Sequence, residues 1–423
     1  MSDKIILILG SGAQGSAVAQ NMNDEPNVKT IICADYDLAA VQNLEKKFSK
    51  VKGYKVNAKS VDEIISLGKS IGQKIDLIVN ALPLCFARNC LNAALALECN
   101  YQDFAAGDFI KEGNEYERGK IDEEWVDGIK YMLSDYAKKF KAINKLAIIG
   151  TGSAPGLVCL ATRLAVKDLD TCDTIYNICY EGVKAKRFIP FWFAPVVALS
   201  DMAEPAYAYE KGEIIQTPSM SFPIERKYDE LNKTETFYEH AHDEPVYYAL
   251  AANEYLKGCK NAYFKYGGIG IDFSLPLLRC GLLSHKPETI NGATIAPFDF
   301  VLSHIPPAPK YENEIQSIID EGIEEDGGCL VVEAYGKKDG KKVLNELHVS
   351  APGLIESFKR AKLTAEQYLT GQSGGLFTKL FVEEKYEQTG LISTVMLTYK
   401  EIDYYWDLAK KLDITYSIIK KSY

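Results

Sequence analysis

The sequence predicts an α/β fold: a doubly wound parallel sheet, then an inserted α+β domain with a mostly antiparallel sheet, then a helical C-terminal tail. Two observations support this prediction. The first 105 residues alternate short, continuously apolar runs with amphipathic stretches, and longer β-type runs replace them after Cys172. Continuous apolar strands separated by helices are typical of a parallel sheet whose two faces are both covered.

Six strands are expected in the first domain, which we place at residues 1–165. The apolar runs predict strands at residues 5–9, 30–34, 75–79 and 146–149, with weaker candidates at 54–57 and 100–104. Stretches with helical spacing lie between them at residues 14–22, 38–48, 61–71 and 84–97. The alternation of strand and helix makes parallel pairing the expected arrangement.

The second domain is expected at residues 166–356, with a role in substrate binding and dimerisation. A hairpin is predicted from residues 329–335 and 343–350, because Asp339-Gly340 between them is a turn signal. Residues 357–423 have helical spacing and are expected to return to the first domain. Within them, the glycine-rich stretch at 371–375 is expected to break the helix as a connector.

Composition narrows the function classes. The 423 residues carry 48 Lys and Arg against 58 Asp and Glu, a net charge of −10, which disfavours nucleic-acid or anionic-membrane partners because both need clustered positive charge. The longest apolar stretch, at 189–199, holds two prolines and is too short to span a bilayer. The ten cysteines contain no C-x-x-C pair, so we expect reduced thiols in a cytoplasmic protein.

The strongest chemical signal is a G-x-G-x-x-G turn between the first strand and the first helix. Gly10 permits the tight turn, Gly12 lets a pyrophosphate approach the backbone, and Gly15 allows the helix to pack closely on the strand. The phosphates would rest on the helix N-terminus, at Ala13 and Gln14, where N–H groups and the helix dipole favour negative charge. The motif predicts a Rossmann-type dinucleotide-binding domain.

Asp35 lies twenty positions after the last glycine, at the end of the second predicted strand. A carboxylate there accepts hydrogen bonds from both ribose hydroxyls and repels a 2′-phosphate. Neither Tyr36 nor Asp37 supplies a positive charge for that phosphate, so NAD is the expected cofactor and NADP the alternative. Asp37 is also placed to cap the helix that begins near residue 38.

Three more residues lie at the carboxyl ends of predicted strands, where doubly wound sheets bind ligands. Asn80 and Pro83 bracket an N-x-x-P loop that we expect near the nicotinamide ribose, although the loop equally suits a simple helix start. Asp103 follows the fifth strand and is the candidate ionisable group near the nicotinamide. The alternative for Asp103 is a helix or turn cap.

At this point the sequence resembles the saccharopine dehydrogenase family. The resemblance rests on the glycine turn, the N-x-x-P loop, Asn-Tyr-Gln-Asp at 100–103, the glycine-rich turn at 150–157 and His-Asp-Glu-Pro-Val at 242–246. It implies a Rossmann domain with an inserted substrate domain, and reversible hydride transfer at a carbon bearing nitrogen. Ala154 is a departure, because many relatives carry Asp before the Pro-Gly of that turn.

Such chemistry needs groups that handle a proton and hold substrate carboxylates. His242 is the candidate for proton handling or substrate binding, and the alternative is an ordinary loop. For substrate binding the candidates are Arg187, beside an aromatic run, and Ser153 in the 150–157 turn; the alternative for Arg187 is a surface residue lying over aromatics. His240 and His242 with two adjacent carboxylates lack a third spaced ligand, so no metal is expected.

The expected function is therefore an NAD(P)-dependent oxidoreductase acting on a C–N bond of an amino acid, an amino-acid adduct like saccharopine, or a carboxylated polyamine. Two alternatives remain: a dehydrogenase of the same fold acting on an alcohol or hydroxy acid, and a catalytically silent dinucleotide-binding protein. A homodimer joined through sheet edges is expected only by analogy.

Overall fold

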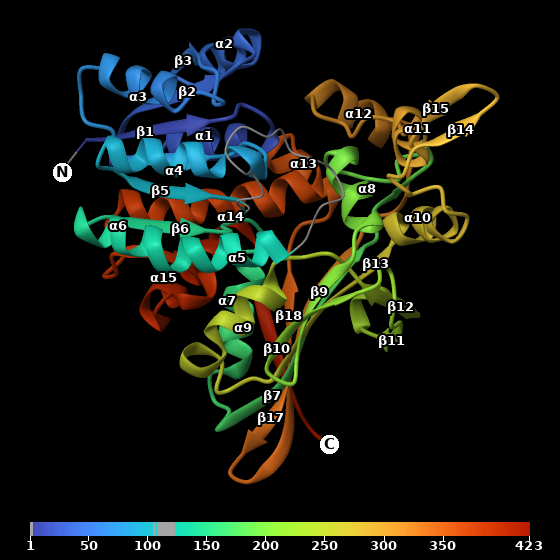
Figure 1. Cartoon of the computed structure of the whole chain (residues 1–423). Helices are drawn as coiled ribbons and strands as arrows, with labels where there is room; N and C mark the ends of the chain where they lie inside the picture. The colour runs from blue at the N-terminus through green and yellow to red at the C-terminus, as the bar shows by residue number, and fades with distance from the viewer. Residues whose placement is uncertain (1–2, 105–106, 108–122) are drawn as a thin grey trace. The chain divides into compact units, whose positions relative to one another are not determined.

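The computed structural model describes residues 3–104, 107 and 123–423, and the chain forms two compact units. In the described part, the first unit comprises residues 3–104, 107, 123–160 and 369–412. The second comprises residues 161–368 and 413–423. The chain passes from one unit to the other within helices α7 (Leu157–Val166) and α14 (Ala365–Val382), which are labelled in Figure 1.

The first unit is built on a seven-stranded sheet in the order β19-β6-β5-β4-β1-β2-β3, with every pair parallel. The strand order reverses between β1 and β4, which is the switch point where such sheets bind ligands. The strands and the remaining helices of this unit are β1 (Lys4–Leu9), α1 (Ala13–Asn23), β2 (Val28–Asp35), α2 (Leu38–Lys47), β3 (Val51–Lys55), α3 (Val61–Ser70), β4 (Leu77–Asn80), η1 (Leu84–Phe86), α4 (Ala87–Ala96), β5 (Asn100–Asp103), α5 (Glu123–Tyr131), the π-helical turn η2 (Met132–Tyr136), α6 (Ala137–Ala142), β6 (Leu146–Ile149), β19 (Gly390–Ser393), η4 (Thr394–Met396), α15 (Tyr399–Ala409) and η5 (Lys410–Leu412).

The predicted doubly wound sheet is confirmed, with one correction. Six strands were expected from the first part of the chain, and the structure adds a seventh, β19, beside β6. Its four residues are buried, yet the segment is short and follows a helix, so its spacing alone did not distinguish it from a loop. β6 is apolar and buried along its whole length, as expected for a strand whose sheet is covered on both faces.

The glycine-rich stretch at 371–375 is also a correction. It lies inside α14 instead of breaking it. A Cβ added at Gly371 would lie 2.4 Å from Ala17 Cβ of α1, and one at Gly375 would lie 2.7 Å from Asn21 Nδ2. The glycines therefore let α14 pack directly on α1, which offsets their poor helix propensity.

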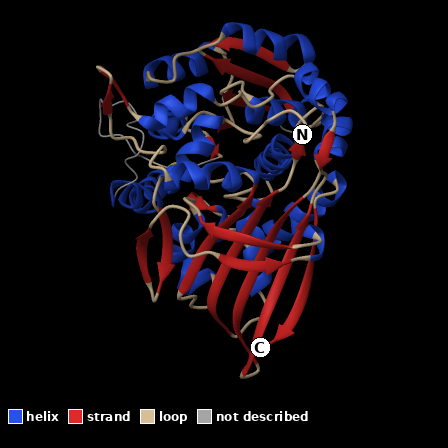
Figure 2. Ribbon diagram, turned by 90° about the vertical axis from the view of Figure 1, so that its right-hand side faces the viewer, coloured by secondary structure: helices blue, strands red, loops and turns tan. Residues whose placement is uncertain are grey.

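The second unit is built on a nine-stranded, mostly antiparallel sheet, whose long strands run side by side in Figure 2. Its main path is β10-β9-β13-β7-β17-β18-β20, and β11 and β12 join it at β13. Its elements are β7 (Thr171–Glu181), β8 (Lys184–Ala185), α8 (Pro195–Ala203), β9 (Ala206–Glu210), β10 (Glu213–Thr217), β11 (Ile224–Lys227), η3 (Asp229–Leu231), β12 (Thr234–Glu239), α9 (Glu244–Tyr255), β13 (Asn261–Gly268), α10 (Ile269–Arg279), β14 (Glu288–Ile290), β15 (Ala293–Ile295), α11 (Pro297–His304), α12 (Glu312–Glu321), β16 (Ile323–Glu325), β17 (Gly328–Lys338), β18 (Lys341–Ser350), α13 (Leu354–Ala361) and β20 (Thr415–Ser422).

The predicted hairpin is confirmed as β17 and β18, and both turn residues, Asp339 and Gly340, have positive φ, as a two-residue hairpin turn requires. The tail is not helical throughout: its last eight-residue element is strand β20, which pairs with β18. Periodicity missed β20 because six of its eight residues are exposed, so the strand has no buried face to mark it. Among the described residues, every helix is too short or too polar to cross a bilayer.

Candidate functional site

The glycine turn joins β1 to α1 with the geometry that a phosphate-binding turn needs. Gly10 has φ +95°, and a Cβ there would lie 2.8 Å from the Ala81 carbonyl oxygen. A Cβ at Gly15 would lie 1.9 Å from the Gly10 carbonyl oxygen, so this position is closed to any side chain. A Cβ at Gly12 meets no described atom within 4 Å, so open space lies in front of the helix.

The residues around this open space have unmet polar atoms. Ala13 and Gln14 begin α1, whose first turn holds neither a side-chain cap nor an acidic residue. Gln14 Oε1 and Ser11 Oγ are buried and have no hydrogen-bond partner among the described residues. The N–H groups of the helix N-terminus, its dipole and the Ser11 hydroxyl, which can donate a hydrogen bond, fit a dinucleotide pyrophosphate.

Asp35 ends β2 beside the same turn. One carboxylate oxygen accepts a hydrogen bond from the Ser11 backbone N–H at 2.7 Å, and the other accepts from the Asp37 N–H at 3.0 Å. These bonds fix the carboxylate at the mouth of the turn, as the position of a ribose ligand requires. Asp37 caps α2, because its Oδ1 accepts from the Ala39 N–H at 2.9 Å.

A hydrogen-bonded chain links three strand ends at the carboxyl edge of the sheet. Asn80 Nδ2 donates to the Tyr101 hydroxyl at 3.0 Å, and that hydroxyl donates to Asp103 Oδ2 at 3.0 Å. Asp103 Oδ1 accepts from the Gly150 N–H at 2.9 Å. Asp103 is fully buried, so its carboxylate fixes the turn after β6. Sequence reasoning quoted Tyr101 only as part of a motif and missed its linking role.

Ser153 lies in the turn after β6, and Pro83 lies in the loop after β4, both in the first unit. Ser153 Oγ shares a hydrogen bond with Thr370 Oγ1 at 2.9 Å. Pro83 begins the short helical turn η1, which agrees with the alternative of a plain helix start. Gln102 was not a candidate, yet it is completely buried and its Nε2 donates to Thr151 Oγ1 at 3.0 Å and to the Gly374 carbonyl oxygen at 2.9 Å.

His242 lies in the second unit, just before α9. Its ring stacks on Phe264 at 3.9 Å between centroids, and Nδ1 contacts Glu244. Burial alone would lower the pKa of His242, but the carboxylates of Glu244, Asp243 and Asp201 raise this pKa to about 9. The imidazole is therefore positively charged at neutral pH and able to donate a proton.

Arg187 forms an ion pair on the surface of the second unit. Its guanidinium is bound by Glu321 of α12, with Nε 2.8 Å from Glu321 Oε2, and it also donates to Ser317 at 2.8 Å. Its side chain is 39% exposed, and that of Glu321 is 45% exposed. The structure thus places Arg187 at the surface, paired with a protein carboxylate, and its role as a substrate ligand stays a prediction.

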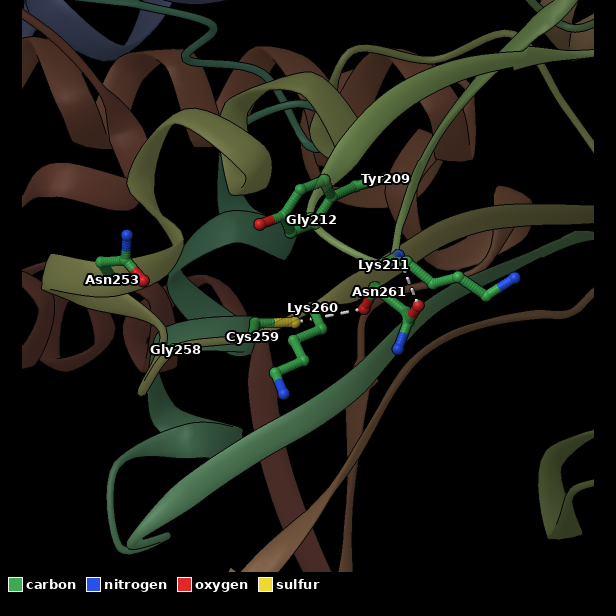
Figure 3. A pocket seen from close by; sticks show the side chains of 8 residues that line it. All are labelled: Tyr209, Lys211, Gly212, Asn253, Gly258, Cys259, Lys260 and Asn261. Atoms are coloured by element: carbon green, nitrogen blue, oxygen red, sulfur yellow. Dashed lines mark hydrogen bonds between the residues drawn. The ribbon is translucent and has the colours of Figure 1, made fainter.

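A hollow of about 600 Å³ lies elsewhere in the second unit (Figure 3). None of the candidate residues lines it. Its walls include the exposed side chains of Lys211 and Lys260 and the buried thiol of Cys259. The Lys211 backbone N–H donates to Asn261 Oδ1 at 3.0 Å, and the Cys259 thiol contacts the Asn261 carbonyl oxygen. The lining residues are Tyr209, Lys211, Gly212, Asn253, Gly258, Cys259, Lys260 and Asn261.

Comparison with known proteins agrees with this arrangement. Residues 6–147 match the model of the family described as Saccharopine dehydrogenase NADP binding domain. The chain is similar in fold to apo saccharopine dehydrogenase (L-Glu forming) from Saccharomyces cerevisiae, with a TM-score of 0.66 and 14% identity over 99% of this chain and 100% of that chain. An amine dehydrogenase from Mycobacterium smegmatis aligns over 94% of this chain and 96% of that chain, with a TM-score of 0.44 and 10% identity.

The parallel sheet, the glycine turn and the matched domain define the class of protein: the chain is an NAD(P)-dependent dehydrogenase. Residues 6–147 are similar to the nucleotide-binding domain of the saccharopine dehydrogenase family, and the chain shares its fold with the yeast enzyme. The family resemblance and the NAD(P) cofactor expected from the sequence are therefore confirmed.

Proposed function

We propose that this dehydrogenase transfers a hydride at a C–N bond of an amino acid, an amino-acid adduct like saccharopine, or a carboxylated polyamine. The observation that carries the proposal is the match of residues 6–147 to the nucleotide-binding domain of the saccharopine dehydrogenase family. The open space at Gly12 supports its cofactor part. When bound, the nicotinamide cofactor supplies or accepts the hydride. The chain supplies binding, orientation and proton handling.

The residues of the first unit have binding and positioning roles in this proposal. Gly10, Gly12 and Gly15 shape the turn that holds the pyrophosphate, and the N–H groups at Ala13 and Gln14 face it. Asp35 binds the ribose hydroxyls, which favours NAD over NADP. Asn80 and Pro83 form the loop beside the nicotinamide ribose, and Ser153 contacts the substrate.

Asp103 receives a changed role. Because it is fully buried and both its carboxylate oxygens accept hydrogen bonds, we assign it to positioning the Gly150 turn and the Tyr101 hydroxyl. His242 is the proposed general acid, since its raised pKa keeps a proton available at neutral pH. All ten cysteines are free thiols, which supports the proposed cytoplasmic location, and a homodimer remains part of the proposal.

Fluorescence titration with NADH and NADPH tests the cofactor part of this proposal. We expect saturable binding of both, with NADH tighter. A turnover screen then compares saccharopine, lysine and carboxylated polyamines with hydroxy acids and alcohols. Turnover of hydroxy acids or alcohols without turnover of any amine would identify the alternative dehydrogenase. Cofactor binding without any turnover would identify a silent dinucleotide-binding protein.

A further inference from the structure

Two buried cysteines lie at the same level of two neighbouring strands in the second unit. β7 and β13 pair in parallel, and their register places Thr174 beside Asn261. Cys172 precedes Thr174 by two residues and Cys259 precedes Asn261 by two residues, so the same register, continued along both chains, places the cysteines side by side. Neighbouring strands lie about 4.8 Å apart, which is within the Cα separation of about 4.4–6.8 Å that a disulfide requires.

Backbone hydrogen bonds continue this pairing beyond the start of β13. The Lys260 N–H donates to the Asp173 carbonyl oxygen at 3.3 Å, and the Cys172 N–H donates to the Lys257 carbonyl oxygen at 3.1 Å. The two bonds reach the chain on either side of Cys259. They therefore hold the segment that carries Cys259 against the start of β7.

The contacts of the two sulfur atoms agree with this register. Cys259 Sγ lies 3.1 Å from the Asn261 carbonyl oxygen, and Cys172 Sγ lies 4.0 Å from the Thr174 carbonyl oxygen. Each sulfur thus lies against one member of the registered pair. The Cys172 thiol also donates a hydrogen bond to the Cys259 sulfur, so the two sulfur atoms face each other.

The two thiols differ in their access to solvent. Cys259 lines the hollow of about 600 Å³, and Figure 3 shows its sulfur among the lining side chains. The described lining carries Lys211 and Lys260 and no carboxylate side chain, which suits a thiolate. Cys172 is not one of the lining residues and lies against β17, with Sγ 3.6 Å from the Tyr335 carbonyl oxygen. A small solute in the hollow therefore meets Cys259 first.

The hydrogen bond between the thiols makes Cys259 the more reactive of the two. That bond is the main cause that lowers the pKa of Cys259, and it outweighs burial, which acts in the opposite direction. Hydrogen bonds to the backbone at Asn261 and Lys260 lower this pKa further, whereas the Asp173 charge raises it. The same thiol–thiol bond, together with burial, raises the pKa of Cys172. Because the thiolate is the nucleophile, Cys259 reacts first while Cys172 keeps its proton.

We propose that Cys172 and Cys259 are a redox-active pair that forms a reversible disulfide when the protein meets hydrogen peroxide. The Cys259 thiolate attacks one peroxide oxygen: an S–O bond forms, the O–O bond breaks and hydroxide leaves. Sulfur loses two electrons to the peroxide and becomes a sulfenic acid. The Cys172 sulfur then attacks the Cys259 sulfur: the S–S bond forms, the S–O bond breaks, and the leaving hydroxide takes the Cys172 proton as water.

A dithiol reverses the reaction, because its two thiols supply the two electrons and two protons that restore both cysteines while it becomes a disulfide itself. The oxidised bond ties β7 to the segment before β13. This modification site is separate from the glycine turn, so it does not depend on the proposed hydride transfer.

A second pair of cysteines on neighbouring strands provides an internal control. β7 and β17 pair in antiparallel fashion, with Cys179 beside Leu330 and Cys329 beside Tyr180. Side chains alternate between the two faces of a sheet, so the thiols of Cys179 and Cys329 point to opposite faces. This pair cannot form a disulfide without backbone movement.

Peptide mapping by mass spectrometry on the full chain tests the proposal. The reduced protein is treated with hydrogen peroxide, the remaining thiols are alkylated, and a digest is analysed without reduction. We expect a peptide pair joined through Cys172 and Cys259 that disappears after dithiothreitol treatment. It should be at least roughly tenfold more abundant than any pair joined through Cys179 and Cys329.

Three variants test the order of the two steps. Cys172→Ser should stop the reaction at the sulfenic acid, so dimedone should label Cys259 in this variant. Cys259→Ser should lose the disulfide and should give little dimedone labelling at Cys172. Cys329→Ser is the matched control, because Cys329 is also buried, and it should leave the Cys172–Cys259 disulfide unchanged. Equal labelling of Cys172 in Cys259→Ser and of Cys259 in Cys172→Ser would overturn the assignment of Cys259 as the first thiol to react.

Cys280 reports whether the oxidant has acted, because its thiol is exposed. The peroxide concentration is raised until Cys280 is oxidised in the wild-type protein. Oxidised Cys280 without a Cys172–Cys259 peptide pair overturns the proposal, and so does an equal yield of the Cys179–Cys329 pair. The wild-type map alone decides between these outcomes, so the proposal stays testable even if a variant fails to fold.

Discussion

The Tyr101 hydroxyl donates a hydrogen bond to Asp103 Oδ2 at 3.0 Å, and it accepts one from Asn80 Nδ2 at the same distance. An amide NH₂ group can only donate and a carboxylate can only accept, so the direction of this chain is fixed. Because Asp103 also accepts from the Gly150 N–H, the chain holds the ends of β4, β5 and β6 in one arrangement.

Removal of the linking hydroxyl should cost stability. In Tyr101→Phe, the Asn80 amide and the Asp103 carboxylate both lose the hydrogen bond to the Tyr101 hydroxyl in a buried site, so we expect a loss of about 1–3 kcal/mol in the free energy of unfolding. Urea unfolding followed by circular dichroism measures it. Tyr36→Phe is the matched control, because Tyr36 is 78% exposed, and it should change stability by less than about 0.5 kcal/mol. Equal losses in the two variants would refute the buried chain.

The glycine turn gives a prediction that separates folding from cofactor binding. Gly12→Ala should fold as well as wild type, since its Cβ meets open space, but it should lose NAD(P)H binding because the new methyl group occupies the phosphate position. Gly15→Ala should lose stability by about 1–3 kcal/mol, since its Cβ would lie 1.9 Å from the Gly10 carbonyl oxygen. Thermal unfolding and fluorescence titration check both. Normal NADH affinity in Gly12→Ala would place the pyrophosphate elsewhere.

Cofactor choice should depend on Asp35. Asp35→Ser removes the charge that repels a 2′-phosphate, so we expect the ratio of NADPH to NADH dissociation constants to fall roughly tenfold. Asp37→Asn removes a charge two residues away and keeps the cap on α2, so its effect on the ratio should be smaller. If the ratio is the same in Asp35→Ser and wild type, Asp35 is not the ribose ligand.

The sequence predicted features that depend on local spacing, and it missed those that depend on distant contacts. The turn at Gly10–Gly15 and the hairpin at Asp339-Gly340 both follow from short-range backbone requirements. The glycines of α14 were misinterpreted because helix propensity cannot show that Ala17, more than 350 positions away, packs against Gly371. Gln102 was missed for the same reason, because only the fold brings its side chain to Thr151 and to the Gly374 carbonyl oxygen.

Arg187 and Arg226 should behave differently when each is replaced by alanine. The Arg187 pair with Glu321 is exposed to solvent, which screens its charges, so Arg187→Ala should leave both stability and substrate KM unchanged. Arg226→Ala leaves the buried carboxylate of Glu333 without its cation, because Glu333 is 2% exposed and both its oxygens accept from Arg226. This variant should lose about 3 kcal/mol in the free energy of unfolding. Urea unfolding and steady-state kinetics measure these effects. A large rise in KM for Arg187→Ala would restore it as a substrate ligand.

Stability should fall as pH rises through the range in which His242 titrates. The folded-state pKa of His242 is about 9, above its ordinary value of 6.5, so the folded protein holds this proton more tightly than the unfolded chain. The stabilisation is complete below about pH 6.5 and is lost as pH rises through 9, with an upper limit of about 3 kcal/mol. Glu181 and Glu366 contribute in the same direction at lower pH, because their folded-state pKa values are also raised.

Two separate variants, one at His242 and one at its partner Glu244, isolate the contribution of His242 to the pH dependence of stability. His242→Gln keeps a hydrogen bond to Glu244 but has no titrating proton, so its melting temperature should fall less than that of wild type between pH 6.5 and 9. Glu244→Gln removes the carboxylate that raises the pKa of His242 most. The fall in melting temperature should therefore occur at lower pH in this variant than in wild type. Thermal melts at half-unit pH steps provide the measurement. Parallel curves for wild type and His242→Gln would show that another group controls the pH dependence, because a residue that does not titrate in this range contributes no slope.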